Sequence, residues 1–185
     1  MAWRLGVAVL VVDDDSVTVE GYAVSGYFDE CSAPPVIVLS KSGGEQKWVG
    51  VLLHEYCHAT QWFENQPFYT VAGNCQLDAW LGGKLVKNID AQIKSVQEME
   101  ADNERRTVRL AKELGAPLDI ELYCQAANAY IHFHNVMAVE RRWYKRGQGP
   151  YQCPEILELC NKTIDSDFKK TPKALFEAIA KRIRD

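Results

Sequence analysis

The chain has 185 residues, of which 47% are hydrophobic and 25% are charged, as is typical of one soluble globular domain with a sizeable core. The formal net charge of −4 provides no basic surface for binding nucleic acid or an anionic membrane. The six cysteines are irregularly spaced and include no C-x-x-C pair, so we expect mostly reduced, buried thiols and a cytoplasmic protein.

The N-terminal part is predicted to be mainly β. Leu5–Val12 and Val17–Val24 are rich in β-branched residues and are separated by an aspartate-rich turn. The first of them is too short to span a bilayer and is not followed by a signal-peptide cleavage site. A third strand is expected at Val36–Leu39, and the prolines before it indicate that it starts at a sheet edge.

The rest of the chain is predicted to be helical. Ser42-Gly43-Gly44-Glu45 is a plausible capping box for a helix from about Gly43 to Glu64. Residues 65–87 are expected to form a loop with short irregular pieces, before a second long helix over Asn88–Leu114. Later helices are expected at Asp119–Tyr144, Pro154–Asn161 and Pro172–Ile183.

Strands followed by helices predict an α+β fold. We expect a small N-terminal β-sheet and a largely helical core within one domain, residues 1–185. Its parts would be a mainly β segment (1–41), a segment of active-site helices (42–114) and a helical C-terminal part (115–185).

The most informative motif is H-E-x-x-H, at His54-Glu55-Tyr56-Cys57-His58. On a helix, residues four apart share a face, so His54 and His58 can bind one metal ion. Glu55 is rotated by about 100° and can reach a metal-bound water without being a ligand. A run with no charge other than Glu55 between Lys47 and Glu64 indicates a buried helix, in which these polar groups need partners.

Zinc hydrolases use three protein ligands and leave the fourth position to water. The other two histidines do not have the spacing of a third histidine ligand, so a carboxylate is expected. Glu98 and Asp102 are four residues apart on the second helix and can serve as ligand and outer-sphere hydrogen-bond acceptor. Glu100 and Glu104 form a competing pair on a different face.

Together, H-E-x-x-H and the later E-x-x-A-D of Glu98–Asp102 resemble the gluzincin metallopeptidases. The related groups are the HtpX-like membrane peptidases, the ImmA/IrrE-like proteins, which have E-x-x-A-N, and the compact minigluzincins. The resemblance covers residues 42–114. It implies a zincin-like core in which Glu98 binds Zn²⁺, Asp102 orients a ligand histidine, and Val36–Ser40 is an edge strand that binds peptide substrate.

These features predict a zinc metallopeptidase with Glu55 as general base, acting on a peptide or protein substrate, with no nucleic-acid or membrane partner. The alternative is a zinc-containing regulatory or binding protein of ImmA/IrrE-like type, with little or very selective proteolysis. The sequence leaves the oligomeric state open. His132, His134 and Tyr130 are candidates for stabilising an oxyanion or contacting a ligand, although an ordinary hydrogen-bonded histidine is the preferred explanation for each imidazole.

Overall fold

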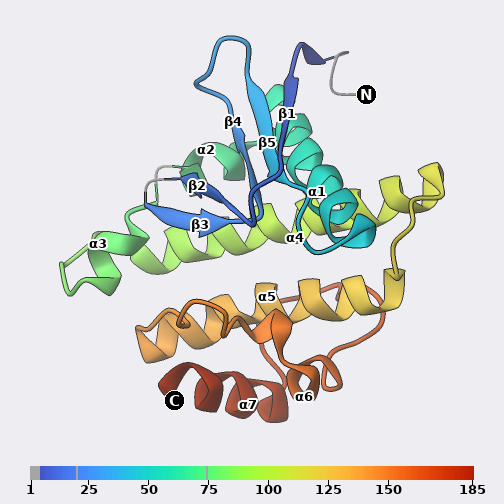
Figure 1. Ribbon diagram of the computed structural model, residues 1–185. Helices are drawn as coiled ribbons and strands as arrows, with labels where there is room; N and C mark the ends of the chain where they lie inside the picture. The colour runs from blue at the N-terminus through green and yellow to red at the C-terminus, as the bar shows by residue number, and fades with distance from the viewer. Residues whose placement is uncertain (1–4, 20, 74) are drawn as a thin grey trace. The chain divides into compact units, whose positions relative to one another are not determined.

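The computed structural model describes residues 5–19, 21–73 and 75–185, and it confirms an α+β fold with a small N-terminal sheet region followed by helices (Figure 1). In chain order the elements are β1 (Ala8–Val12), β2 (Val17–Val19), β3 (Tyr22–Val24), β4 (Gly26–Asp29), β5 (Val36–Ser40), α1 (Glu45–Phe63), α2 (Pro67–Gly73), α3 (Leu77–Leu81), α4 (Ile89–Leu114), α5 (Ile120–Glu140), η2 (Pro150–Gln152), α6 (Pro154–Leu157) and α7 (Lys173–Arg184).

The chain divides into two compact units. The first comprises Met1–Gln66 and Asn103–Asp119, and the second comprises Pro67–Asp102 and Ile120–Asp185. Helix α4 is one continuous helix that contributes a segment to each unit. The three parts proposed from the sequence for a single domain do not follow this division, and that domain assignment stays a prediction.

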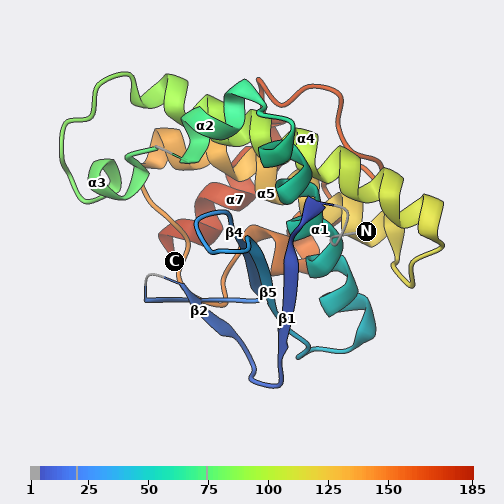
Figure 2. The same cartoon turned by 90° about the horizontal axis from the view of Figure 1, so that it is seen from above.

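The main sheet of the first unit has the strand order β1-β5-β4, and Figure 2 shows the three strands side by side. Strand β5 pairs in parallel with β1 and antiparallel with β4, so Val36–Ser40 is the central strand. Its prediction as the edge strand was therefore wrong. Strand β4, which was not predicted from the sequence, takes an edge. Gly26 fits here because a Cβ on it would lie 2.5 Å from Cγ1 of Val51 on α1.

Strand β1 forms the other edge of this sheet. Three consecutive apolar residues of β1 are 44%, 53% and 46% exposed, namely Val9, Leu10 and Val11. Successive side chains of a strand point to opposite faces, so both faces of β1 are open to solvent. The aspartates Asp13, Asp14 and Asp15 follow directly and are also exposed.

The segment predicted as one strand over Val17–Val24 is a hairpin of β2 and β3, with Val17 opposite Val24. The chain reverses around Gly21, whose φ of +86° lies in the left-handed region that favours glycine. Glu20 lies outside the described residues. One long strand was expected because the β-branched pattern continues on both sides of this turn.

Helix α1 packs against the main sheet, as Figure 1 shows, through an apolar cluster. The buried residues of this cluster are Val7, Ile37, Leu39 and Ala59. The predicted capping box is wrong. Gly44 is the N-cap, with a φ of +87°, and no side chain caps the helix. The Ser42 hydroxyl instead donates to the backbone oxygen of Asp15 at 2.8 Å.

In the second unit, α5 packs with η2, α6 and α7 (Figure 1). Their core includes Phe133, Met137, Ile156, Leu175 and Ile179. Helix α5 ends at Glu140, not at the predicted Tyr144.

The end of α5 is fixed by Arg141, which has a φ of +50°. Its Nε donates to the backbone oxygen of Trp80 at 2.8 Å, and its guanidinium lies 5.0 Å from the Trp80 ring centroid. The predicted loop over residues 65–87 contains two short helices, α2 and α3. Among the described residues, no helix is both long and apolar enough to cross a membrane.

Candidate metal centre

Helix α1 places the two histidines of the H-E-x-x-H motif side by side. The ring centroids of His54 and His58 are 4.7 Å apart and the rings are nearly perpendicular, at 84°. Their Nε2 atoms lie 3.1 Å from one another. This is the arrangement expected of residues one helical turn apart whose rings point at a common centre.

A neighbouring group contacts the other nitrogen of each ring. Nδ1 of His58 lies 2.9 Å from Oε1 of Gln61, a fully buried residue one turn further along α1. Nδ1 of His54 lies 3.2 Å from Oε1 of Glu104 and 2.9 Å from Nδ2 of Asn103, both on α4. Nδ1 of His58 thus faces a residue of α1, and Nδ1 of His54 faces residues of α4. The two Nε2 atoms face each other.

The environment keeps His58 in the neutral state that a metal ligand requires. Burial is the main cause that lowers its pKa to about 3, and the nearby His54 acts in the same direction. The hydrogen bond to Gln61 opposes these two effects. At neutral pH the ring therefore has one hydrogen and one lone pair.

Glu100 completes a group of three possible ligands. One ligand atom from each of His54, His58 and Glu100 lies within 4.8 Å of the others, a spacing compatible with a metal ion. Glu100 is buried, and it lies one turn before Glu104 on the continuous helix α4. The structure thus selects the carboxylate that ranked second on sequence grounds.

Glu98, which the E-x-x-A-D pattern selected as the third ligand, has other surroundings. Glu98 has a side chain that is 53% exposed, and it pairs with Lys94 at 3.5 Å on the outer face of α4. The structure thus places Glu100, and not Glu98, beside the two histidines, and the ligand role of Glu98 stays a prediction. Glu104 and Asn103 contact Nδ1 of His54, and the outer-sphere role of Asp102 stays a prediction.

The donor set fits a zinc-like ion. Zn–N bonds of about 2.0–2.1 Å at a tetrahedral angle separate two nitrogens by roughly 3.3 Å. The Nε2–Nε2 distance of 3.1 Å is close to this value. The carboxylates of Glu55, Glu100 and Glu104 are all buried nearby, and several buried carboxylates favour a bound cation. Imidazole and carboxylate ligands also suit other divalent transition metals.

Glu55 is buried next to this group without belonging to it. Its carboxylate accepts a hydrogen bond from the backbone N–H of Phe28, in β4. Burial raises the pKa of Glu55, and the nearby Glu104 adds to the rise, whereas His54 and the Phe28 hydrogen bond oppose it. A carboxylate with a raised pKa is suited to take up a proton during a reaction and release it later.

Two further contacts hold α1 against the C-terminal half of α4. Nη1 of Arg106 donates to Oγ1 of Thr60 at 3.2 Å and lies 3.0 Å from a Glu64 carboxylate oxygen. The buried Cys57 thiol is hydrogen bonded to Thr107, and burial raises its pKa to about 11. Cys57 is therefore a protonated packing residue at neutral pH, as expected from the sequence for most of the cysteines.

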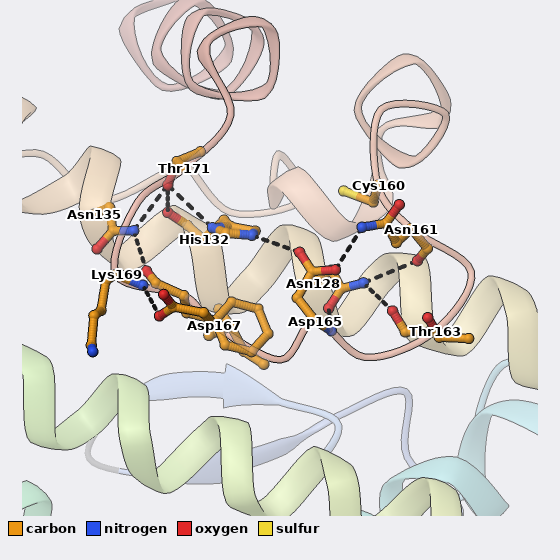
Figure 3. A network of polar contacts seen from close by, with 12 residues as sticks. Asn128, His132, Asn135, Cys160, Asn161, Thr163, Asp165, Asp167, Lys169 and Thr171 are labelled. Atoms are coloured by element: carbon orange, nitrogen blue, oxygen red, sulfur yellow. Dashed lines mark hydrogen bonds and ion pairs between the residues drawn. The ribbon is translucent and has the colours of Figure 1, made fainter.

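His132 belongs to a different polar network, shown in Figure 3. Its Nε2 lies 2.9 Å from Oδ2 of Asp165, and its Nδ1 lies 3.2 Å from Oγ1 of Thr171. Asn135 also donates to the Thr171 hydroxyl, at 2.9 Å. Asn128 donates to the backbone oxygen of Asn161, so this face of α5 holds the segment from Asn161 to Thr171. Both ring nitrogens of His132 are used in that structural role.

His134 is buried on another face of α5. Its Nδ1 donates to the backbone oxygens of Tyr130 and Ile131, at 3.1 and 3.3 Å. Its buried Nε2 has no hydrogen-bond partner among the described residues. Burial lowers the pKa of His134 to about 4, and the Tyr130 ring packs against it with centroids 5.1 Å apart. The roles suggested for His134 and Tyr130 in oxyanion binding stay predictions.

No protein-family model, curated protein or solved structure matches this chain. The resemblance to gluzincins therefore rests on the sequence motifs alone. The glutamate of the E-x-x-A-D motif, Glu98, is not the one that lies beside the histidines. With Glu100 in place of Glu98, the α4 residues around the site are Glu100, Asn103 and Glu104. Asn103 was not predicted from the sequence, and Glu104 was considered only as a member of the competing pair.

Proposed function

We propose that the protein is a zinc-dependent peptidase whose metal is held by His54, His58 and Glu100. The observation that supports this most strongly is that ligand atoms of His54, His58 and the Glu100 carboxylate lie within 4.8 Å of one another, with the two Nε2 atoms 3.1 Å apart. Such a site would have three protein ligands and leave the fourth position to solvent or substrate, as catalytic zinc sites do.

When bound, zinc would lower the pKa of a coordinated water towards about 7 and polarise a substrate carbonyl. Glu55 would take the proton from the attacking water and later deliver it to the leaving amine. Its raised pKa suits this exchange, because a carboxylate that holds its proton more strongly is a better base. Glu104 would hold the His54 ring in position through Nδ1.

The substrate would be an extended peptide paired with the edge of β4. Strand β4 pairs only with β5 among the described strands, and its Phe28 N–H points at Glu55. A strand added beside β4 would bring its backbone to the proposed base, and backbone pairing tolerates many side chains. Peptides with N-methylated backbone positions, which cannot donate in such pairing, should be cleaved more slowly than unmodified ones.

The function is tested with Glu55→Gln, which keeps the size of the side chain and removes its basicity. We expect the variant to bind as much zinc as the wild type and to lose at least about 10²-fold in cleavage of a peptide library. Zinc content is measured by mass spectrometry of the metal. Glu45→Gln is the matched control, because Glu45 is an exposed glutamate in the first turn of the same helix.

A wild type that retains zinc but cleaves no peptide faster than Glu55→Gln would contradict the peptidase proposal. The zinc-containing regulatory or binding protein would then be the better description. Activity that is equal in the wild type, Glu55→Gln and Glu45→Gln would point to a contaminating peptidase.

A further inference from the structure

The carboxamide of Gln61 is buried in a place where an apolar side chain would be expected. Gln61 faces the protein interior from α1, is 0% exposed, and lies one turn beyond His58. Its Oε1 is 2.9 Å from Nδ1 of His58. Burying a polar carboxamide costs free energy unless it makes hydrogen bonds, so a specific interaction must favour it at this position.

The direction of this hydrogen bond determines which nitrogen of His58 carries the hydrogen. A carboxamide oxygen can only accept, so Nδ1 of His58 must donate. In a neutral imidazole the lone pair is then on Nε2, the atom that faces His54. The same bond fixes the rotation of the ring about its side-chain torsions.

We propose that Gln61 is a positioning residue that prepares His58 to bind the metal. The inference rests on the proposed metal centre. Its consequence is an asymmetric outer sphere, in which the oxygen of a neutral carboxamide orients His58, whereas the Glu104 carboxylate and the Asn103 amide nitrogen face His54. Residues that orient metal-binding histidines typically contribute a factor of about 10 to 100 in metal affinity.

The test measures zinc affinity of the full-length protein by competition with a chromophoric chelator. Gln61→Met fills a similar volume and removes the acceptor, and it should bind zinc about 10- to 100-fold more weakly. Gln61→Glu keeps an acceptor oxygen in the same place and should bind at least as tightly as the wild type. Gln125→Met is the matched control, because Gln125 donates to the backbone oxygens of Leu157 and Cys160 in the second unit.

A purely structural role for Gln61 gives a different result. In that case Gln61→Met would unfold at a lower urea concentration than the wild type in the absence of metal, as is expected of Gln125→Met. It would nevertheless keep the zinc affinity of the wild type, and this result would overturn the inference. Gln61→Glu binding as weakly as Gln61→Met would also overturn it, because an acceptor would be present without effect. A wild type that binds no zinc would instead remove the metal centre on which the proposed function depends.

A second measurement is independent of whether Gln61→Met folds. The ¹⁵N chemical shifts of the imidazole in the metal-free wild type report which nitrogen carries the hydrogen. The inference requires the hydrogen of His58 on Nδ1. A hydrogen found on Nε2 would overturn it.

Discussion

Nε2 of His54 and Nε2 of His58 lie 3.1 Å apart, although an acceptor oxygen lies beside Nδ1 in both rings. If each Nδ1 donates its hydrogen to that oxygen, both Nε2 atoms present lone pairs to each other. Two lone pairs at this distance repel unless a cation or a proton lies between them. In that tautomeric state the pair of rings would favour a cation between them, whereas the Asn103 amide, 2.9 Å from Nδ1 of His54, would favour a hydrogen on Nε2 of His54.

Replacing either histidine should abolish specific metal binding. His54→Ala and His58→Ala each remove one of the two converging nitrogens, and two remaining ligands hold zinc poorly. We expect about one zinc per wild-type chain and none in either variant after dialysis, measured by metal mass spectrometry. Full zinc occupancy in both variants would exclude this site.

Glu100→Gln should weaken zinc binding much more than Glu98→Gln. Only Glu100 lies within ligand distance of both histidines, whereas Glu98 is exposed and paired with Lys94. The two substitutions are identical in chemistry and lie about half a turn apart on one helix, so each controls for the other. Chelator competition measures the effect, and the opposite order of affinities would return the ligand role to Glu98.

Glu104→Gln should cost about 10- to 100-fold in zinc affinity, because it removes the carboxylate that contacts Nδ1 of His54. Asp102→Asn should change the affinity less, because Glu104 is the carboxylate that contacts Nδ1 of His54. Isothermal titration of the metal-free proteins with zinc distinguishes the two. A large loss in Asp102→Asn alone would show that the outer sphere has been assigned to the wrong residue.

His134 should make the fold less stable in acid. The unfolded chain protonates a histidine below about pH 6.5, but His134 in the folded chain, with a pKa lowered to about 4 by burial, stays neutral over most of this range. The unfolded state therefore binds more protons in this window, and stability falls as the pH drops from about 6.5 to 4. The contribution is about 3 kcal/mol at about 1.4 kcal/mol per pKa unit.

Urea unfolding of the metal-free protein at pH 7 and pH 4.5 measures this loss, and His134→Gln should lose less stability between the two values than the wild type. His58 has a lowered pKa as well and contributes to the loss in both proteins. The comparison therefore isolates His134. Equal losses in the two proteins would show that His134 titrates normally in the fold.

The buried face of helix α4 includes Glu100 and leaves out Glu98. A repeat of alternating four and three residues connects the buried positions Ile93, Gln97, Glu100, Glu104, Thr107 and Ala111. The positions on the other side are charged and exposed, namely Lys94, Glu98, Arg105, Arg109 and Lys112. The E-x-x-A-D pattern instead selects Glu98, whose carboxylate lies on the solvent-exposed side of α4.

Other parts of the site could not be derived from local pattern. The bounds of α4 were predicted within one residue, and His54, Glu55 and His58 were placed on one helix because the motif has helical spacing. Asn103 contacts His54 only because α1 packs on α4, and no spacing along the chain encodes that pairing. Strand β4 has only four residues, too few to show an alternating pattern, and this led to the error about which strand forms the edge.

The open apolar strand at the other edge of the sheet has a consequence for how the protein behaves at high concentration. Strand β1 exposes Val9, Leu10 and Val11 along an edge that offers backbone hydrogen bonds to another chain. The exposed aspartates at 13–15 can oppose this association, because their like charges repel when the β1 edges of two chains pair. Salt above about 0.5 M shortens the range of that repulsion to a few ångströms. Light scattering should therefore rise with added sodium chloride in the wild type, and Leu10→Lys should suppress the rise.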